Sequence, residues 1–322
     1  MKAAVYEKYG PPEVIQIKEV EKPVPKENEM LVKIHATSIN YVDWQVLKGE
    51  SKFLRLTTGG LQKPKQKILG DDISGTVEAV GEKITRFKPG DEVFGLCNTG
   101  GFAEYRCVTE DYFVSKPPSM SFEEAAAIPE AAIPALLGIR DNGQVKSGQK
   151  VLICGASGGV GTYAVQIAKS YDTEVTGVCS TGKIDYVLSI RADHVIDYTK
   201  EDFSKNNERY DLIFAAGGDR SIFDYKRALA PEGIYVCIGG SLSQYFQALL
   251  LGPLLSLMGS KKMGAMFAQP TTEDFQFLIE LYEAGKLVPV IDRMYSLSKI
   301  VEALRYYGEG KTRGKIVITM EQ

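Results

Sequence analysis

The residues best suited to chemistry lie in a glycine-rich stretch, KVLICGASGGVGTYAVQIAK, near the middle of the chain. Gly155, Gly158 and Gly161 follow an apolar run and open a helical one. Such glycines allow a tight turn, close approach of backbone to a pyrophosphate, and close packing of helix on strand, while the helix N-terminus favours an anion. The stretch predicts a dinucleotide site; the alternative is a turn that serves packing alone. Four residues are expected at the pyrophosphate: Ser157, Gly158, Gly159 and Val160.

The choice between NAD and NADP depends on the end of the following strand. An NAD site usually has an acidic residue there for the ribose 2′-hydroxyl. Here the run EVTGVCSTGK ends without one, and Ser180 and Lys183 offer a hydroxyl and a cation to a 2′-phosphate. Tyr198, after the next strand, is placed to close over the same group. The combination favours NADP(H), although Lys183 alone would read as a solvated surface lysine.

Two further glycine-containing runs end predicted strands. They are AAGG at residues 215–218 and IGG at residues 238–240. Ligands of open α/β sheets bind outside the carboxyl ends of the strands. We therefore expect cofactor contacts from Gly217, Ile238 and Gly239.

A parallel sheet must position these residues. After about residue 120, apolar strand-like runs alternate with helical ones, which predicts parallel pairing with right-handed crossovers. Before it, runs such as MLVKIHATSI alternate with a period of two, typical of strands. A final strand, residues 314–319, is expected to rejoin that first part. The predicted fold class is α/β, with a β-rich domain (1–120 and 271–322) and a doubly wound parallel-sheet domain (121–270).

Composition excludes several classes of protein. The 322 residues carry 38 Lys+Arg and 41 Asp+Glu, a net charge of -3, so a nucleic-acid partner is not expected. Five scattered cysteines favour reduced thiols over a disulfide framework. The first residues lack the apolar run of a signal peptide, and the longest apolar run is about half a membrane span. We expect a cytoplasmic protein without stable membrane insertion.

Eight stretches together resemble the medium-chain dehydrogenase/reductase superfamily, over essentially the whole chain. They are ATSINYVDW, GDDISGTVEAVG, FKPGDEVFG, GGFAEY, EEAAAIP, GASGGVG, RADHVIDY and GKIVIT. The chain is most similar to the zinc-free quinone oxidoreductase branch. The resemblance implies a GroES-like catalytic domain and a Rossmann domain, with the substrate beside the nicotinamide. Many members are dimers or tetramers, and we expect a homodimer.

The alcohol-dehydrogenase branch of that superfamily binds a catalytic zinc through Cys, His and Cys. By resemblance those positions correspond to Asn40, Asp71 and roughly Glu130. An amide and two carboxylates make a poor zinc site, since zinc favours imidazole and thiolate ligands. We therefore expect no bound metal; a harder cation is the alternative.

Without a Lewis acid nothing would stabilise an alkoxide, so oxidation of a plain alcohol is not expected. The expected reaction is hydride delivery from NADPH to a small electrophilic acceptor, either a quinone or another α,β-unsaturated carbonyl compound. Two alternatives remain. One is an enoyl or ketone reductase of lipophilic substrates, and the other is a non-catalytic NADPH-binding sensor or scaffold protein.

The candidate substrate-side residues follow from the same resemblance. Asn40 is a site residue in the resembled branch and is the catalytic candidate; its alternative role is a turn at a strand end. Tyr41 and Trp44 are candidates for an aromatic substrate pocket, with core packing as the alternative for each. Asp71 is a further pocket candidate. Because Asp72 is adjacent, an extended backbone would let only one of the two acids face the substrate.

Predictions also follow for two single residues and for one apolar segment. Asp43 is expected to fix local backbone rather than donate a proton. Lys315, in GKIVIT, is expected to be a strand-edge lysine, with cofactor contact as the alternative. Residues 243–267 are unusually apolar, which suggests a subunit interface, a lid over a lipophilic pocket, or contact with a membrane surface.

Overall fold

The computed structural model describes residues 1–51, 55 and 60–320, and they form two compact units. Unit 1 contains Met1–Glu130, Pro270–Ile279 and Pro289–Gln322, and unit 2 contains Ala131–Gln269 and Glu280–Val288. Two helices, α4 (Pro129–Leu136) and α10 (Thr272–Glu283), have residues in both units. The boundaries expected from the sequence, 120/121 and 270/271, stay a prediction.

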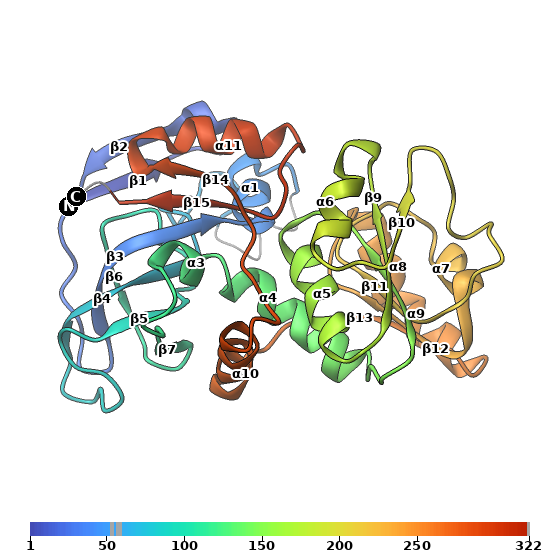
Figure 1. Ribbon diagram of the computed structural model, residues 1–322. Helices are drawn as coiled ribbons and strands as arrows, with labels where there is room; N and C mark the ends of the chain where they lie inside the picture. The colour runs from blue at the N-terminus through green and yellow to red at the C-terminus, as the bar shows by residue number, and fades with distance from the viewer. Residues whose placement is uncertain (52–54, 56–59, 321–322) are drawn as a thin grey trace. The chain divides into compact units, whose positions relative to one another are not determined.

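Unit 1 is built on a sheet with strand order β14-β15-β3-β4-β5-β7, in which β6 also pairs with β3 (Figure 1). Its strands are β3 (Met30–Ile39), β4 (Asp72–Val80), β5 (Glu92–Leu96), β6 (Tyr105–Val108), β7 (Phe113–Ser115), β14 (Ile291–Ser296) and β15 (Lys315–Thr319). A separate antiparallel pair joins β1 (Lys2–Tyr6) to β2 (Ile15–Glu19). Strand β15 pairs antiparallel with β3, which confirms that the last strand rejoins the first part of the chain.

Among the described residues, the helices that lie wholly within unit 1 are short. They are η1 (Pro12–Val14), α1 (Tyr41–Lys48), α3 (Phe122–Ala126), η4 (Leu297–Lys299) and α11 (Ile300–Gly308). Strand β3 is buried along most of its length, so its sequence does not show a strict polar alternation. Helix α1 begins after Asn40 and ends at Gly49, whose φ of 59° suits a glycine cap. Asn40 is therefore held at a strand-to-helix turn.

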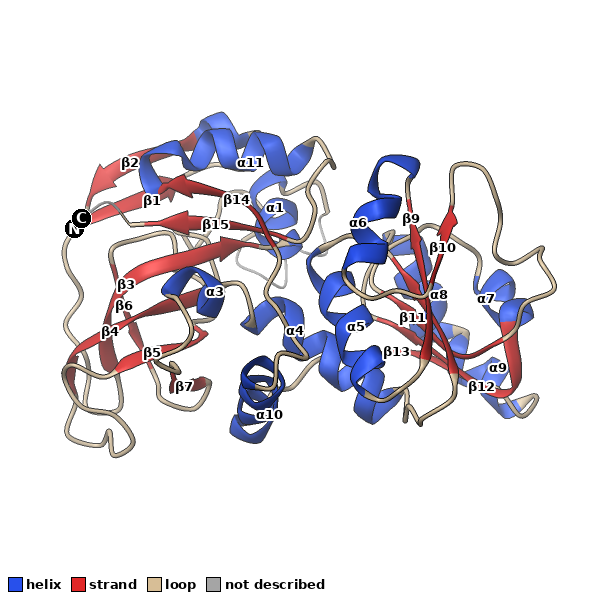
Figure 2. Cartoon of the chain, in the orientation of Figure 1, coloured by secondary structure: helices blue, strands red, loops and turns tan. Residues whose placement is uncertain are grey.

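Unit 2 contains a sheet with strand order β10-β9-β8-β11-β12-β13 (Figure 2). Every pair along this order is parallel, which confirms the predicted doubly wound sheet. The strands are β8 (Lys150–Cys154), β9 (Glu174–Cys179), β10 (His194–Asp197), β11 (Tyr210–Ala215), β12 (Leu229–Cys237) and β13 (Lys262–Ala265). The helices are η2 (Leu137–Asn142), α5 (Gly159–Ser170), η3 (Thr181–Lys183), α6 (Ile184–Ser189), α7 (Ile222–Ala228), α8 (Leu242–Leu250) and α9 (Gly252–Leu257).

Helices cover both faces of this parallel sheet. Ile213 packs in a buried cluster with Tyr225 of α7 and Ala248 of α8. The neighbouring Phe214 points to the opposite face, where its ring lies against Gly138 of η2. Burial on both faces explains why the strands read as continuous apolar runs. Within the described residues, no helix is both long and apolar enough to cross a bilayer.

Candidate functional site

The glycine-rich loop of unit 2 joins β8 to α5. Gly155 follows β8 directly with a φ of 78°, a conformation that favours glycine. A Cβ atom on Gly161 would lie 2.0 Å from the carbonyl oxygen of Gly155, so the helix can approach the loop only without a side chain. Gly158 is the N-cap of α5, and Ser157 beside it is buried. The helix thus presents its first N–H groups at the end of β8, which suits a pyrophosphate.

The strand order places this loop at a topological switch point. Strand β8 lies between β9 and β11; from it the chain builds the sheet outward through β9 and β10, then returns to add β11, β12 and β13 on the other side. The connections after β8 and β11 therefore leave in opposite directions, and such a divergence forms the ligand crevice of open α/β sheets. Because the strands are parallel, their carboxyl ends share one edge, here called the cofactor edge.

All ten residues predicted to contact a cofactor follow strands that end at this cofactor edge. Ser180 follows β9, Tyr198 follows β10, and Gly217 follows β11. Ile238 and Gly239 follow β12, and Lys183 ends η3. The remaining four belong to the glycine loop and the first turn of α5: Ser157, Gly158, Gly159 and Val160.

One acid at the cofactor edge was missed in the sequence. Asp197, the last residue of β10, is buried and accepts the hydroxyl of Thr181 as well as the N–H and hydroxyl of Thr199, at 3.0 and 2.7 Å. These bonds, that from Thr181 foremost, lower the pKa of Asp197 to about 2. The carboxylate ties the loop after β9 to the loop after β10 and so orders the segment that carries Ser180 and Lys183. The signal was present as HVIDY, in which Asp197 directly precedes Tyr198, but only the tyrosine was singled out.

Unit 1 contains a polar cluster centred on Asp72, here called the Asp72 cluster. The Asn40 amide nitrogen donates to Asp72 at 2.9 Å, and the Asn40 amide oxygen accepts from Lys315. The Lys315 ammonium also lies 3.1 Å from the Asp72 carboxylate. Ser38 donates to the same carboxylate, and the backbone N–H of Glu130 does so at 2.6 Å. Asp72 and Lys315 have 0% and 2% of their side chains exposed, so this ion pair is fully buried.

The structure corrects one expectation about this cluster and clarifies a second. The strand-edge position predicted for Lys315 is wrong, because β15 lies between β14 and β3 and the side chain is buried. Of the two adjacent acids, Asp72 is the one that bonds to Asn40. The Asp71 carboxylate instead accepts the backbone N–H of Asn98 at 2.6 Å. The pocket role predicted for Asp71 stays a prediction.

Several carboxyl groups around the Asp72 cluster have raised pKa values. Asp43 accepts the backbone N–H groups of Asn40 and Gly70, at 2.9 and 2.8 Å, which confirms its backbone-fixing role. Burial raises the pKa of Asp43 to about 7. Burial, and then the charge of Asp72, raise the pKa of Asp71 to about 6, and burial raises that of Glu130 well above its ordinary range. Burial thus favours the protonated form of these three carboxyl groups more than exposure to solvent would.

The two aromatic candidates on α1 have different surroundings. Tyr41 has 53% of its surface exposed. Trp44 is partly buried against an apolar cluster, and its ring centroid lies 6.2 Å from that of Tyr307. Trp44 thus contributes to packing in unit 1. A role for either residue in a substrate pocket stays a prediction.

The residues expected by resemblance at the zinc-ligand positions, Asn40, Asp71 and roughly Glu130, offer an amide and two carboxyl groups, which suit zinc poorly. The Asn40 oxygen accepts from the Lys315 ammonium, and Glu130 carries a raised pKa. Neither a thiolate nor an imidazole stands at these positions, although zinc prefers both. Across residues 1–51, 55 and 60–320, no group of three or more His, Cys, Asp or Glu side chains is arranged to hold a metal ion.

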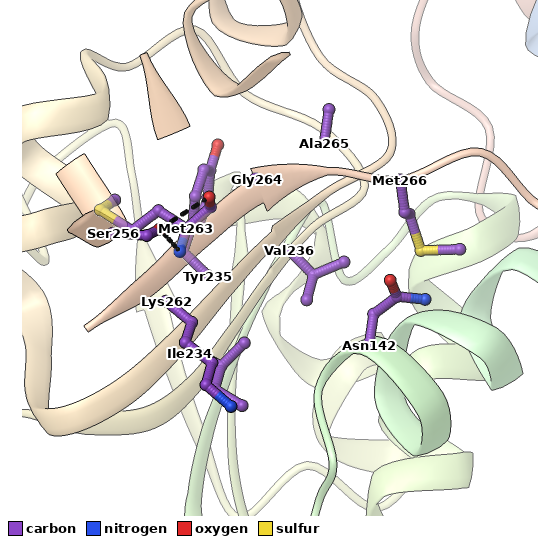
Figure 3. A pocket seen from close by; sticks show the side chains of 10 residues that line it. All are labelled: Asn142, Ile234, Tyr235, Val236, Ser256, Lys262, Met263, Gly264, Ala265 and Met266. Atoms are coloured by element: carbon purple, nitrogen blue, oxygen red, sulfur yellow. Dashed lines mark hydrogen bonds between the residues drawn. The ribbon is translucent and has the colours of Figure 1, made fainter. Parts of the chain in front are cut away.

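A pocket of unit 2 contains none of the predicted site residues in its lining. Residues of β12 and β13 line it, together with Asn142 and Ser256 (Figure 3). The Ser256 hydroxyl, from α9, accepts the N–H of Met263 at 2.8 Å and lies 3.2 Å from the Met263 carbonyl oxygen. Ser256 thus covers backbone groups of β13 at the edge of the sheet. Exposed backbone groups of an edge strand can otherwise pair with a strand of another chain.

Known proteins match both halves of the chain. A family model described as the alcohol dehydrogenase GroES-like domain matches residues 26–118, and one described as zinc-binding dehydrogenase matches residues 190–318. A chloroplastic quinone-oxidoreductase, QR1 from Triphysaria versicolor, is 32% identical over 99% of this chain and 98% of its own. A 2-methylene-furan-3-one reductase from Solanum lycopersicum is 31% identical over 99% of this chain and 79% of its own.

Solved structures match as well. The quinone oxidoreductase from Coxiella burnetii is 28% identical, with a TM-score of 0.88, and the match covers 100% of this chain and 99% of that one. Together with the GroES-like model and the parallel sheet of unit 2, this match confirms the fold class expected from the sequence.

Proposed function

The chain belongs to the quinone oxidoreductase branch of the medium-chain dehydrogenase/reductase superfamily, and we propose that it transfers a hydride from NADPH to a quinone or another α,β-unsaturated carbonyl compound without zinc. The observation that carries the proposal is the Asp72 cluster. By resemblance, Asn40 and roughly Glu130 correspond to two alcohol-dehydrogenase zinc ligands. The Lys315 ammonium bonds to the Asn40 oxygen, where a second cation would be repelled. An acceptor that is already electron-poor does not need a Lewis acid.

The cofactor edge of unit 2 supports the choice of cofactor. When bound, a reduced nicotinamide supplies the hydride. The N–H groups around Ser157 and Gly158 would hold its pyrophosphate, and Ser180 and Lys183 would hold a 2′-phosphate, with Tyr198 beside them. Further contacts are proposed from Gly159, Val160, Gly217, Ile238 and Gly239.

The Lys183→Ala variant tests the preference for NADPH. Loss of the ammonium should weaken NADPH binding about tenfold more than NADH binding, because only NADPH carries the 2′-phosphate. Titration of each nucleotide by protein fluorescence measures the two dissociation constants. Equal losses would contradict the assignment of NADP(H).

Asn40 is the proposed catalytic contact of unit 1. An amide nitrogen carries two hydrogens, and the bond to Asp72 uses one of them. The other can donate to the substrate oxygen on which negative charge develops. Lys315 and Asp72 hold the amide in one orientation while it does so. Tyr41, Trp44 and Asp71 are proposed to line the substrate pocket.

The experiment that tests the function is a panel of acceptors with NADPH. It should contain benzoquinones and naphthoquinones, exocyclic and linear enones, and plain ketones as the negative class. We expect oxidation of NADPH with the conjugated acceptors and a loss of about tenfold or more in kcat for Asn40→Ala. Reduction of plain ketones at similar rates would favour the lipophilic ketone reductase. Tight NADPH binding without oxidation would favour a sensor or scaffold protein.

We propose further that the protein is a cytoplasmic homodimer. Its five cysteines are free, which suits a reducing compartment. Large apolar side chains of α9 and the residue that follows are exposed: Leu254 at 57%, Leu257 at 86% and Met258 at 78%. Ser256 bonds to part of the outer edge of β13, so pairing of β13 with the same strand of a second copy would be interrupted. We therefore propose that the interface is formed by side chains of α8 and α9.

A further inference from the structure

Helix α8 directs one buried glutamine toward two loops of the cofactor edge. Gln244 is 2% exposed, although it lies in a segment that is otherwise rich in apolar residues. Its amide oxygen accepts the hydroxyl of Tyr225 at 2.7 Å and the backbone N–H of Arg220 at 3.1 Å. Its amide nitrogen donates to the carbonyl oxygen of Gly239 at 2.9 Å. One side chain therefore bonds both to the loop after β11 and to the loop after β12.

These two loops lie beyond the end of the strand ladder. There the Ser241 N–H donates to the carbonyl oxygen of Gly218 at 2.9 Å and the Ser241 hydroxyl donates to Asp219, and Gln244 adds a further link between the loops. The parallel pairing of β11 with β12 stops at Ala215 and Cys237. Beyond it, Gly218 and Gly240 have φ values of 117° and 103°, which no regular strand adopts. A Cβ atom on Gly240 would lie 2.4 Å from the amide nitrogen of Gln244, so the loop packs directly on the amide.

We propose that Gln244 is a positioning residue for the nicotinamide cofactor. Its bonds to Arg220 and Gly239 hold the loop that carries Gly217 against the loop that carries Ile238 and Gly239, at a separation suited to the cofactor, and its bond to Tyr225 fixes the amide on α7. This inference rests on the proposed function, since it takes those loops as cofactor contacts. Removing the amide leaves the Arg220 N–H and the Gly239 carbonyl without their partner, and the loops then sample arrangements that bind the cofactor weakly.

The test compares two glutamines one turn apart on α8. Gln244→Met removes the amide while keeping the length of the side chain. Gln247→Met is the matched control: the Gln247 amide oxygen accepts the N–H of Ile222 at 3.1 Å, at the start of α7, and bonds to neither loop. Both variants should melt somewhat below the parent protein. Only Gln244→Met should raise the dissociation constant for NADPH, by about tenfold, with Gln247→Met within about twofold.

A second variant keeps the test decisive if Gln244→Met does not fold. Tyr225→Phe removes one hydroxyl bonded to Gln244 and keeps the stacked ring, whose centroid is 4.4 Å from that of Tyr235. It should raise the dissociation constant several-fold at temperatures far below its melting point. The proposal would be overturned if a folded Gln244→Met bound NADPH as tightly as the parent protein, even with a lower melting point. If Gln244→Met does not fold, unchanged NADPH binding in Tyr225→Phe would overturn it instead. Failure of the parent protein to bind NADPH would instead refute the proposed function itself.

Discussion

The Asp72 cluster buries an ion pair between Asp72 and Lys315. An ammonium and a carboxylate are buried together, and Asn40 hydrogen-bonds to both. A buried pair of this kind adds little net stability over apolar packing, but breaking it exposes the remaining charge to a low dielectric. The pair therefore fixes the geometry around Asn40 more than it stabilises unit 1.

Removal of the ammonium should be costly. Lys315→Met leaves the Asp72 carboxylate unpaired, and we expect the free energy of unfolding to fall by about 3–5 kcal/mol. Urea unfolding followed by circular dichroism measures the loss. The control is Lys83→Met, which breaks the exposed 2.7 Å pair with Glu27 and should cost less than about 1 kcal/mol. Similar losses in the two variants would show that the Asp72–Lys315 pair is not effectively buried.

Asp71 gives a pH dependence with a definite sign. Its folded-state pKa, about 6, lies above the ordinary value of 3.8, so the folded state binds more protons than the unfolded state between these values. Stability from this group therefore falls as the pH rises from about 4 to 6 and is constant above. Asp71→Asn removes the titration and keeps an oxygen for the Asn98 N–H. Relative to the parent, the variant should gain about 2 kcal/mol between pH 4.5 and 7.5. A gain in the opposite direction would contradict the raised pKa.

Among the elements of the site, the glycine loop between β8 and α5 is the one whose packing depends most strictly on the absence of a side chain. Gly161→Ala would place its Cβ atom 2.0 Å from the backbone oxygen of Gly155, which cannot move without shifting β8 or α5. We expect a loss of about 1–3 kcal/mol in stability and weaker NADPH binding. Gly259→Ala is the control, since a Cβ there meets nothing within 4 Å. Thermal melting and nucleotide titration separate the two, and an unperturbed Gly161→Ala would refute the close packing.

How much could be predicted from the sequence depends on how far apart along the chain the interacting residues lie. The parallel sheet, the glycine loop and the strand-end contacts are predicted from patterns within about thirty residues, and the parallel sheet is confirmed. The order of its strands was not predicted. Lys315 lies 275 positions from Asn40, so no local pattern could reveal that they bond. Strand alternation separated Asp71 from Asp72 without showing which one faces Asn40. Gln244 was missed because the apolar residues around it dominated the interpretation of its segment.

At the scale of the whole molecule, the exposed apolar face of α9 predicts the oligomeric state. Replacing Leu254 and Leu257 together by Glu should convert a dimer of 35.4 kDa chains into monomers, because two carboxylates would be desolvated in the interface. Light scattering after size-exclusion chromatography measures the mass. Val24→Glu changes a similarly exposed apolar residue of unit 1, at 83%, and should leave the mass unchanged. A parent protein that runs as a monomer would contradict the dimer.

The proposed function depends on direct hydride transfer from NADPH to a conjugated carbonyl acceptor, with no metal ion taking part. The most direct measurement uses NADPH deuterated at C4, a linear enone, and protein dialysed against chelator, with its metal content determined by mass spectrometry. The account predicts that the saturated product carries one deuterium on a carbon of the former double bond, at far less than one metal ion per chain. The proposed function would be contradicted if the dialysed protein transferred no deuterium until one metal ion per chain was added back.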